Sequence, residues 1–244
     1  MARPFLSVII PAYNEAIRLP LTLVDVDRHL AEQEYSYEII VVISHSSDHT
    51  VEMVKRFASF LPNLKYIALS ENRGKGFAVK TGMLAAKGTY RLYMDADNST
   101  AVVEFNKMLP YLLGDKADKE KAKYDIVIGS RFLSGSRISP PMPLMRRILG
   151  FKARMWIKVF GVRGFSDTQC GFKAFTSEAA ESLFGGLLTD GWLFDVEILA
   201  MAKKANLKIK EIPVFWAHNP GSKVNLTRYF NSFRELMRIW VRLR

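Results

Sequence analysis

The sequence predicts an α/β fold in which helices flank a mostly parallel sheet, and three observations support this prediction. Short apolar runs alternate with stretches of helical spacing through the first half of the chain. More than ten residues separate consecutive runs, which leaves room for the crossover helix that parallel strands require. The 244 residues are 49% hydrophobic and 24% charged, which is ordinary for a globular chain of one large domain or two small ones.

The first half contains five predicted strands and three predicted helices. Each strand is a short apolar run, and Pro11 stops the first of them. Each helix places apolar residues three or four positions apart, and Asn14 is a suitable cap for the first helix. The strands are expected at residues 5–10, 38–43, 64–69, 90–94 and 124–128, and the helices at residues 15–31, 48–61 and 74–87.

The second half is less regular and ends in an amphipathic helix. Residues 134–143 are rich in Ser, Gly and Pro and are expected to form a loop. Four segments have helical spacing, and one segment has the alternation of a strand. The helices are expected at residues 144–160, 177–184, 194–205 and 226–243, and the strand at residues 208–215. We expect residues 1–224 to form one domain and residues 225–244 a basic terminal helix.

The net charge of +11 is concentrated in the second half of the chain. Residues 1–130 include 16 basic and 16 acidic residues, whereas residues 131–244 include 19 basic and 8 acidic ones. A neutral half followed by a basic half predicts an anionic partner, which is nucleic acid, an anionic membrane surface or a phosphorylated substrate. A general solubility charge is the alternative, but it does not account for the asymmetry.

Several classes of protein are disfavoured. The single cysteine, Cys170, can form neither an internal disulfide nor a thiolate metal cage, and the four histidines lack the spacing of a metal site. No apolar run is long enough for a secretory signal or for a membrane-spanning helix, so we expect a cytoplasmic protein. The sequence contains no recognised nucleic-acid-binding motif, so we expect no nucleic-acid partner.

Two aspartates directly after a predicted strand form the first candidate site. Asp95 and Asp97 follow the run at residues 90–94. Ligands bind beyond the carboxyl ends of strands in open α/β sheets. Two carboxylates in one turn can hold a hard cation such as Mg²⁺ or Mn²⁺ on a diphosphate. The alternative is a turn that caps the next helix.

Three further polar turns are candidates for ligand contact. Residues 71–78 form a glycine-rich turn with Lys75 at a helix start, a pattern that favours phosphate binding but matches neither a P-loop nor a standard dinucleotide site. Residues 167–173 and 220–223 are polar and contain glycine. On composition alone each of these last two segments would be a solvated loop.

Seven short motifs occur along the chain in a recognisable order. They are Pro11-Ala12-Tyr13-Asn14-Glu15, Asn72-Arg73-Gly74-Lys75-Gly76, Asp95-Ala96-Asp97, Gly129-Ser130-Arg131, Asp167-Thr168-Gln169-Cys170-Gly171-Phe172-Lys173, Phe194-Asp195-Val196-Glu197 and Pro220-Gly221-Ser222-Lys223. The set covers nearly all of the chain and resembles the family 2 glycosyltransferases, which have the GT-A fold, a Rossmann-like arrangement. Within that family it is similar to the group of dolichyl-phosphate β-glucosyltransferases and polyprenyl-phosphate mannosyltransferases, and closest to the glucosyl branch.

The resemblance implies a metal-dependent hexosyltransferase. A Mg²⁺ or Mn²⁺ ion would be held by Asp95 and Asp97, with Ser99 at the position of a frequent third ligand. Asp97, Arg131 and Asp195 would have catalytic roles.

The resemblance also implies two substrates, a nucleotide-sugar donor and a polyprenyl or dolichyl phosphate acceptor. The loop at residues 11–15 would line the nucleotide pocket, and Lys223 would approach the donor diphosphate. Arg131, with Arg146 and Arg147, would bind the acceptor phosphate. The full substrate-binding set implied is Pro11, Ala12, Tyr13, Glu15, Ser44, Lys75, Asp95, Arg146, Arg147, Gln169 and Lys223.

One motif departs from the family pattern. The family usually has Val-Asp-Asp-Gly-Ser-x-Asp-x-Thr after the second strand, whereas residues 42–50 read Val-Ile-Ser-His-Ser-Ser-Asp-His-Thr. Ile43 and Ser44 replace the two central aspartates, one of which normally contacts the nucleobase. Loss of a charged hydrogen bond typically costs about 1.5–3 kcal/mol. We therefore expect weak, poorly base-selective donor binding, with uridine still preferred.

Three functions are consistent with the sequence. The first is an inverting transfer of a sugar to a lipid phosphate, with UDP-glucose as the expected donor. This reaction needs no general base because the acceptor is already anionic. The second is a transferase of the same fold that uses GDP-mannose or another acceptor; a polysaccharide or glycolipid acceptor would need a carboxylate base, with Asp195 or Glu197 as the candidate. The third is a non-catalytic membrane-binding homologue.

The basic amphipathic helices favour a peripheral position on the cytoplasmic face of a membrane.

Overall fold

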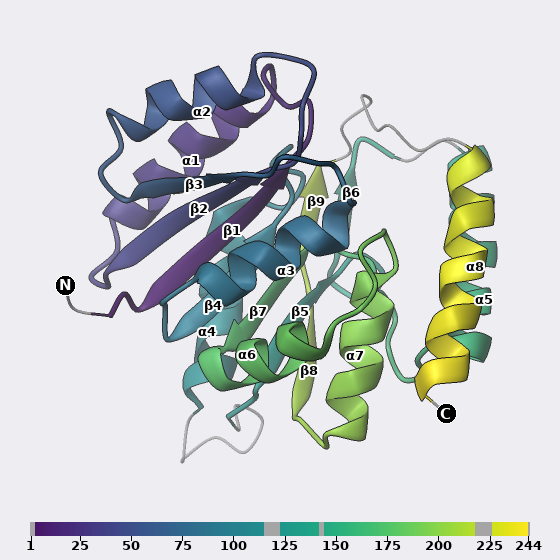
Figure 1. The fold of residues 1–244 in the computed structure, drawn as a ribbon. Helices are drawn as coiled ribbons and strands as arrows, with labels where there is room; N and C mark the ends of the chain where they lie inside the picture. Colours follow the sequence, from purple (N-terminus) through teal and green to yellow (C-terminus); the bar gives the residue numbers. More distant parts are fainter. Residues whose placement is uncertain (1–2, 115–122, 142–143, 218–225, 244) are drawn as a thin grey trace.

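A seven-stranded sheet forms the centre of the structure, a computed structural model that describes residues 3–114, 123–141, 144–217 and 226–243. Side chains are described for these residues except 144–149, 226–233 and 243. The strands of this sheet are β1 (Leu6–Ala12), β2 (Tyr37–Ile43), β3 (Leu64–Ala68), β4 (Tyr90–Met94), β5 (Ile126–Ser130), β7 (Phe172–Thr176) and β8 (Ile209–Pro213). They are arranged in the order β3-β2-β1-β4-β7-β5-β8 (Figure 1).

The sheet is mostly parallel, as the sequence predicts. Strands β1, β2, β3 and β4 pair in parallel, and so do β5 and β8. Strand β7 lies between β4 and β5 and runs antiparallel to both. A separate two-stranded parallel ribbon is formed by β6 (Arg137–Ser139) and β9 (Phe215–Ala217).

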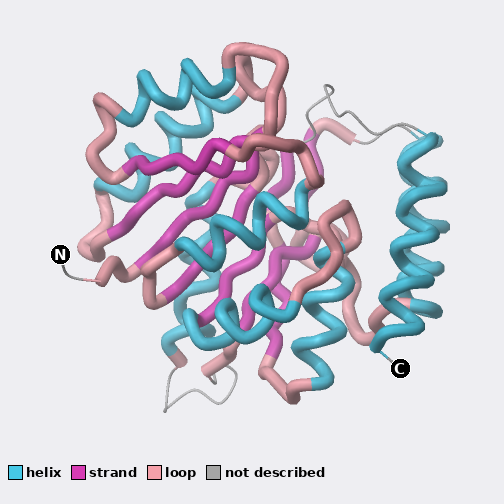
Figure 2. Tube along the Cα trace, in the orientation of Figure 1, coloured by secondary structure: helices cyan, strands magenta, loops and turns pink. Residues whose placement is uncertain are grey.

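The described part of the chain contains eight α-helices; α5 and α8 lie beside one another at one end of the molecule, and the others flank the sheet (Figure 2). The eight helices are α1 (Leu19–Ala31), α2 (Thr50–Ala58), α3 (Lys75–Ala85), α4 (Phe105–Leu113, preceded by the 3₁₀ turn η1, Val102–Glu104), α5 (Leu144–Phe160), α6 (Ser177–Gly186), α7 (Phe194–Lys204) and α8 (Leu226–Leu243). Each has the amphipathic spacing that lets one face pack on the sheet or on a neighbouring helix. None of these helices combines the length and the apolar composition that crossing a bilayer requires.

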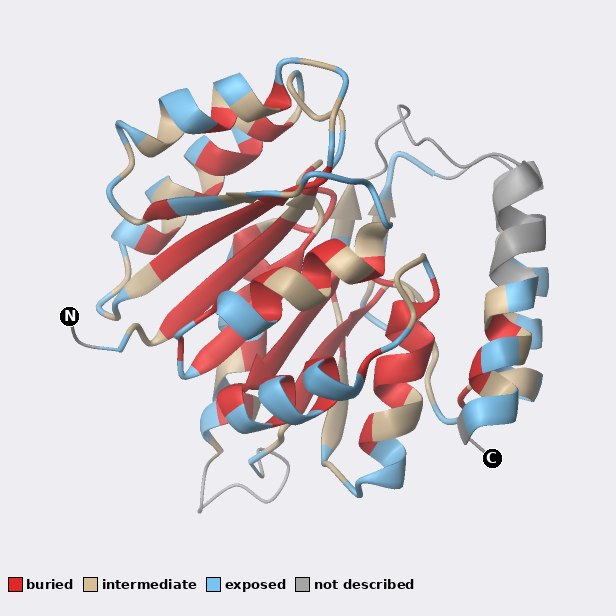
Figure 3. Cartoon of the chain, viewed as in Figure 1, coloured by how far each residue is buried: buried red, intermediate tan, exposed pale blue. Residues whose placement is uncertain are grey.

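The two faces of the sheet bury separate cores because successive side chains of a strand point to opposite faces. Val8 and Ile10 of β1 pack with α1, α2 and α4, whereas Ile9 packs with α3, α6 and α7. Figure 3 shows the buried residues concentrated in the strands and on the inner faces of these helices. Full burial of one such aliphatic side chain contributes about 1.5–3 kcal/mol, so both cores hold the sheet firmly.

Helix α8 packs on the rest of the protein. Leu236 and Ile239 are 3% and 2% exposed and belong to the core on the α3 side of the sheet. The helix lies beside α5 at one end of the molecule and also contacts α7 (Figure 1). The predicted boundary between residues 1–224 and 225–244 falls at the edge of a segment outside the described residues, and the helix beyond it shares the core of the preceding domain.

Three expectations about secondary structure are wrong. Residues 137–139, predicted as part of a loop, form strand β6, because they pair with residues 215–217 of β9. Helix α1 begins at Leu19 rather than at residue 15, because residues 15 and 16 are tied to another segment: their backbone N–H groups donate to the side chains of Thr50 and Asp48. Residues 172–176, predicted partly as loop, form the interior strand β7. Its polar Lys173 can be fully buried there because its ammonium group pairs with Asp195.

Candidate active site

The order of the strands creates a switch point between β1 and β4. From β1 the chain continues to β2 and β3 on one side, whereas β4 lies on the other side of β1. Ligands of open α/β sheets bind at such a point, beyond the carboxyl ends of the strands. The loop after β1 and the aspartates after β4 meet there. The Nη1 atom of Arg18 lies 3.7 Å from Oδ2 of Asp97, and the hydroxyl of Thr22 donates to the carbonyl of Ala96 at 2.8 Å.

The loop after β1 is held by the altered motif after β2. The backbone N–H of Glu15 donates to Oγ1 of Thr50 at 2.9 Å, and that of Ala16 donates to Oδ2 of Asp48 at 3.1 Å. Asn14 adopts a φ of +53°, a left-handed conformation that asparagine tolerates well. Asp48 and Thr50, which this chain shares with the family motif, therefore fix the backbone of the predicted nucleotide loop.

The side chains predicted to contact the nucleotide lie in different environments. Tyr13 is 41% exposed, which leaves its ring accessible to a ligand. The carboxylate of Glu15 accepts from Nε of Arg18 at 2.7 Å. Ser44 follows β2 directly and is buried, and its backbone N–H donates to the carbonyl of Ala12 at 2.9 Å. An uncharged, buried serine thus stands where the family has an aspartate.

Asp95 and Asp97 present their carboxylates from a tight turn directly after β4. Their side chains are 33% and 22% exposed. The backbone N–H of Ser99 donates to Oδ1 of Asp97 at 3.0 Å, and Asn98 has a φ of +54°. Ser99 itself is buried, with only 4% of its surface exposed. The turn therefore directs the two aspartates outward, whereas Ser99 lies deeper.

The two carboxylates fit a hard cation that also binds substrate. Mg²⁺ and Mn²⁺ are commonly held by one or two carboxylates, together with phosphate oxygens and water. Among the described residues there is no group of three or more His, Cys, Asp or Glu side chains that could hold a metal ion. A cation at Asp95 and Asp97 would therefore take its remaining ligands from a substrate or from water.

Gly171 shapes the turn that carries Asp95. The backbone N–H of Asp95 donates to the carbonyl of Gly171 at 3.2 Å, and a Cβ atom at position 171 would overlap the Asp95 carboxylate. A side chain at this position would displace the carboxylate, so the glycine of the fifth motif supports the candidate metal site. Gln169 of the same motif donates its backbone N–H to Oδ1 of Asp167 at 3.1 Å.

Lys75 lies at the first turn of α3 and reaches the aspartates. Its Nζ atom is 2.5 Å from Oδ1 of Asp95 and 5.4 Å from the centroid of the Trp192 ring. Burial alone would lower the pKa of Lys75, but the charges of Asp95 and Asp195 outweigh burial and raise it. The ammonium group therefore stays protonated and can balance negative charge on a diphosphate at this place.

Arg131 follows β5 and is held by a carboxylate that the sequence did not single out. Its Nε and Nη2 atoms donate to the two carboxylate oxygens of Asp167 at 2.7 and 3.0 Å. Burial would lower the pKa of Arg131, but Asp167 raises it, and the charge of Asp95 adds to the effect. Burial would raise the pKa of Asp167, but Arg131 holds it below its ordinary value of 3.8. Both groups are therefore ionised, and the guanidinium is fixed in place.

A second guanidinium lies close to Arg131. Arg154 of α5 stacks on Phe132, with its Cζ atom 3.8 Å from the ring centroid. Burial and the neighbouring charge of Arg131 lower the pKa of Arg154, and Asp167 offsets part of this effect. Two cations near the one buried carboxylate of Asp167 leave a net positive charge. This is the electrostatic environment that an anionic ligand requires.

Asp195 lies beneath the surface of the site. Its Oδ1 atom accepts from Nζ of Lys173 at 2.7 Å and also from the hydroxyl of Tyr93. The residue is 3% exposed, and Lys173 also donates to the carbonyl of Cys170 at 2.5 Å. In this arrangement Asp195 supports the loop before β7, and its predicted catalytic role stays a prediction.

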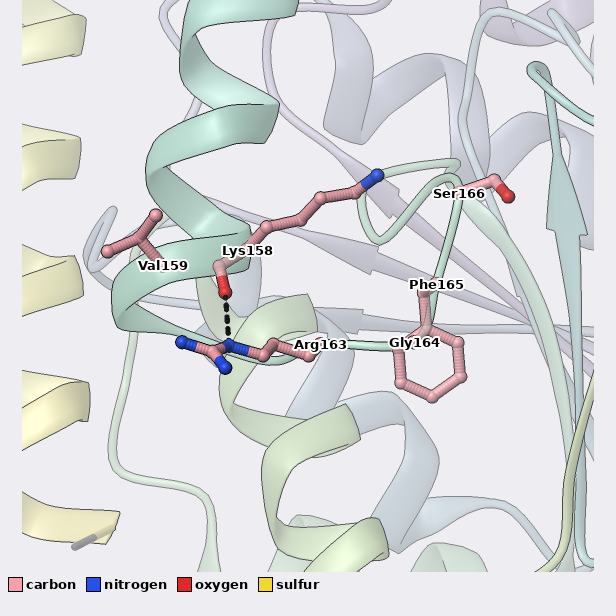
Figure 4. A pocket seen from close by; sticks show the side chains of 6 residues that line it. All are labelled: Lys158, Val159, Arg163, Gly164, Phe165 and Ser166. Carbon is pink, nitrogen blue, oxygen red and sulfur yellow. Dashed lines mark hydrogen bonds between the residues drawn. The ribbon is translucent and has the colours of Figure 1, made fainter.

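An open hollow adjoins the segment that carries Asp167. It lies at the end of α5 and is lined by Lys158, Val159, Arg163, Gly164, Phe165 and Ser166 (Figure 4). The Nε atom of Arg163 donates to the carbonyl of Lys158 at 3.3 Å. None of the predicted site residues lines this hollow, so we place the candidate site at the switch point instead.

Some predicted residues are not located at side-chain level. Lys223 lies outside the described residues, and Arg146 and Arg147 belong to α5 with side chains outside the description. The sequence analysis missed the roles of Arg18, Asp167 and Arg154 in the site. Asp167 had a signal, because it opens the fifth motif, whereas nothing in the local sequence distinguishes Arg18 or Arg154 from other surface arginines.

Comparison with known proteins identifies relatives over nearly the whole chain. Residues 7–177 match the family model described as glycosyl transferase family 2. A dolichyl-phosphate beta-glucosyltransferase of Dictyostelium discoideum is 40% identical over 98% of this chain and 74% of its own length. The enzyme of the same name from Saccharomyces cerevisiae is 36% identical over 91% of this chain and 70% of its own length.

Solved structures show the same fold. Glucosyl-3-phosphoglycerate synthase from Mycobacterium tuberculosis, in complex with Mn²⁺ and UDP, has a TM-score of 0.71 at 16% identity, over 98% of this chain and 80% of that one. A mannosyltransferase from Pyrobaculum calidifontis, in complex with GDP-Man and Mn²⁺, has a TM-score of 0.60 at 23% identity, over 96% of this chain and 61% of that one. The GT-A fold predicted from the sequence is therefore confirmed, and the chain belongs to the family 2 glycosyltransferases.

Proposed function

We propose that this protein transfers glucose from UDP-glucose to dolichyl or polyprenyl phosphate. The observation that carries the proposal is the closeness of a donor-type and an acceptor-type site. Asp95 and Lys75 form the donor-type site. Arg131 and Arg154 form the acceptor-type site. Asp95 follows β4 and Arg131 follows β5, and both strands pair antiparallel with β7 between them, so the two sites lie at the same edge of the sheet. The names of the relatives, dolichyl-phosphate beta-glucosyltransferases, supply the sugar and the lipid.

The donor would bind at the switch point. Tyr13 of the nucleotide loop is exposed, and Lys75 would contact the diphosphate. Asp95 and Asp97 would hold Mg²⁺ or Mn²⁺, which stabilises negative charge on a leaving diphosphate. Lys75 would then release its contact with Asp95 and add its own charge to that stabilisation.

The acceptor would bind at Arg131 and Arg154. Asp167 fixes the Arg131 guanidinium through two hydrogen bonds, so the acceptor phosphate meets a preorganised cation. Arg146 and Arg147 stand about two turns earlier in α5. Arg131 and Arg154 offset the repulsion between the acceptor phosphate and the donor diphosphate. Direct attack of the acceptor phosphate at the anomeric carbon inverts its configuration.

The surroundings of the carboxylates favour this acceptor over a neutral sugar acceptor. A phosphate monoester is already a nucleophile and needs no general base. The two candidate bases are otherwise engaged: Asp195 pairs with Lys173, and Glu197 accepts from the backbone N–H groups of Leu188 and Thr189 at 3.0 Å each. Neither carboxylate is available in this structure to take a proton from a hydroxyl group.

A matched substrate screen tests the proposal. We expect transfer from UDP-glucose to a short polyprenyl phosphate with Mn²⁺, and no transfer to the corresponding polyprenol, which lacks the phosphate. GDP-mannose and UDP-N-acetylglucosamine serve as competing donors. Because Ser44 replaces the usual aspartate, we expect UDP to compete with the donor only weakly but better than GDP. Transfer to an unphosphorylated acceptor, or faster transfer from GDP-mannose, would contradict the assignment.

We further propose that α5 holds the protein on the anionic cytoplasmic face of a membrane. Phe151, Met155 and Val159 recur every four residues on α5 and are 57%, 47% and 53% exposed. Exposed basic residues adjoin this stripe, with Lys152 and Lys158 on the same helix. An apolar stripe bordered by cations matches the interface of an anionic bilayer.

Vesicle sedimentation tests the membrane proposal. We expect binding to vesicles that contain phosphatidylserine, much weaker binding to purely zwitterionic vesicles, and loss of binding when both Phe151 and Met155 are replaced by serine. The control is a double variant of exposed apolar residues elsewhere, Ile17→Ser with Leu21→Ser, which lie just before α1 and in its first turn and are 89% and 78% exposed. Equal sedimentation of both double variants with the parent protein would count against α5 as the contact surface.

A further inference from the structure

The terminal helix α8 reaches the donor side of the site through a loop. Glu235 is the only acidic residue of α8, and its Oε2 atom accepts from the backbone N–H of Leu193 at 3.3 Å. Gly191 lies directly against this carboxylate, and a Cβ atom there would overlap it. Burial raises the pKa of Glu235, while the backbone N–H groups of Leu193 and Trp192 lower it by a smaller amount. The carboxylate therefore rests on the segment at residues 190–193.

The same segment holds the start of α3. The carbonyls of Asp190 and Gly191 accept from the backbone N–H groups of Phe77 and Gly76 at 3.1 Å each. The Asp190 carboxylate also accepts from Nη2 of Arg73 at 2.7 Å. These contacts lie on both sides of Lys75, whose ammonium group faces the Trp192 ring and Asp95. The position of Lys75 thus depends on a loop that Glu235 also contacts.

A second contact connects α8 with the beginning of this loop. Arg242 pairs with the carboxylate of Glu197 in α7. That carboxylate accepts from the backbone N–H groups of Leu188 and Thr189 at 3.0 Å each. The helix therefore holds the loop near both ends, directly through Glu235 and indirectly through Arg242.

We propose that Glu235 of α8 is a positioning residue for the donor diphosphate, acting through the segment at residues 190–193 and Lys75. This inference rests on the proposed function and deepens it, because it makes donor binding depend on the terminal helix. When α8 is seated, the loop holds the start of α3 and Lys75 faces the diphosphate. When the carboxylate is removed, the loop loses a hydrogen-bond acceptor and Lys75 loses its fixed position.

The test measures donor and acceptor separately in the full chain. We expect Glu235→Ala to weaken binding of UDP with Mn²⁺ by about 3- to 30-fold, the range of coupling effects through packed contacts. The Michaelis constant for polyprenyl phosphate and the thermal unfolding midpoint should stay close to those of the parent. Glu235→Gln keeps an oxygen that can accept from Leu193 and should restore most of the UDP affinity. A purely electrostatic or purely structural role would not give this combination.

A matched control and a double-mutant cycle sharpen the test. Like Glu235, Glu104 accepts a backbone N–H at 3.3 Å, here from Phe215 of β9, and it is buried, so Glu104→Ala should leave UDP affinity unchanged. Gly191→Ala pushes a methyl group against the Glu235 carboxylate and should weaken UDP binding on its own. In the Glu235→Ala background this clash is relieved, so Gly191→Ala should add little further loss.

The outcomes separate this inference from the proposed function. Parent protein that binds no UDP would overturn both. Parent protein that binds UDP, with Glu235→Ala binding it equally well, would overturn the positioning role alone. A loss of UDP affinity in Glu104→Ala as large as that in Glu235→Ala would also overturn it, because the effect would then be one of general destabilisation.

Discussion

Replacing Asp97 with asparagine is expected to lower turnover at least about a hundredfold, in line with the loss of a principal electrostatic contact in other enzymes. The thermal unfolding midpoint should stay unchanged. The amide oxygen of asparagine can still accept from the backbone N–H of Ser99, which Asp97 accepts at 3.0 Å, so the turn is retained. The negative charge is lost, and with it the affinity of the turn for a divalent cation.

Two measurements separate this effect from a general one. Excess chelator should abolish the activity of the parent protein, and added Mn²⁺ should restore it. Glu52→Gln, which removes an exposed carboxylate from the first turn of α2, should retain full activity. Full activity of Asp97→Asn, or of the parent protein in chelator, would show that the aspartate turn is not a metal site.

The sequence predicts the parts of the site that lie on single loops. Asp95 and Asp97 follow an apolar strand, and Lys75 starts a helix after a glycine-rich turn, so local pattern alone locates all three. The structure then brings Lys75 and Asp95 into contact. Their closeness depends on the neighbouring positions of α3, β1 and β4, which follow from the alternation of strands and helices.

The contacts between distant segments could not be predicted in this way. Asp167 binds Arg131 because β7 runs antiparallel between β4 and β5, and that strand contains Lys173 at a fully buried position. Strand β7 reads Phe-Lys-Ala-Phe-Thr, so Lys173 interrupts the apolar pattern of a buried strand. Its burial is explained by its pairing with Asp195, which the local sequence does not reveal. Likewise Glu235 is one acid among many basic residues in an amphipathic helix, and its role depends on a loop forty residues earlier in the chain.

The other large effect is expected at Arg131. Arg131→Met removes the cation that neutralises Asp167, a carboxylate with 1% of its surface exposed. An unpaired buried charge typically costs 3–5 kcal/mol, so we expect the free energy of unfolding to fall by about that amount. The Michaelis constant for polyprenyl phosphate should rise at least about tenfold, as for loss of a charged hydrogen bond, with little change for the nucleotide sugar.

The pH dependence of stability identifies the cause. Arg131 lowers the pKa of Asp167, so the pair stabilises the parent protein above the ordinary pKa of 3.8 and this contribution is lost as the pH falls through the lower folded value. In Arg131→Met the Asp167 carboxylate becomes neutral on acidification, and the free-energy cost of its unpaired buried charge disappears. The stability difference between parent and variant should therefore narrow as the pH is lowered from 7 toward the ordinary pKa of the carboxyl group.

A double variant separates stability from acceptor binding. Arg131→Met combined with Asp167→Asn removes both charges. Asp167 accepts from the backbone N–H groups of Arg131 and Gln169 through separate oxygens, and the asparagine oxygen can accept from only one of them. Replacing a buried ion pair by uncharged groups is often nearly neutral, so we expect part of the lost stability to return, less the cost of the N–H group left without its acceptor. The Michaelis constant for polyprenyl phosphate should stay raised, because the cation is still missing.

Arg28→Ala, which removes an exposed arginine of α1, should change neither the stability nor this Michaelis constant. If the double variant regained acceptor affinity together with stability, Arg131 would be a structural residue and the acceptor phosphate would bind elsewhere.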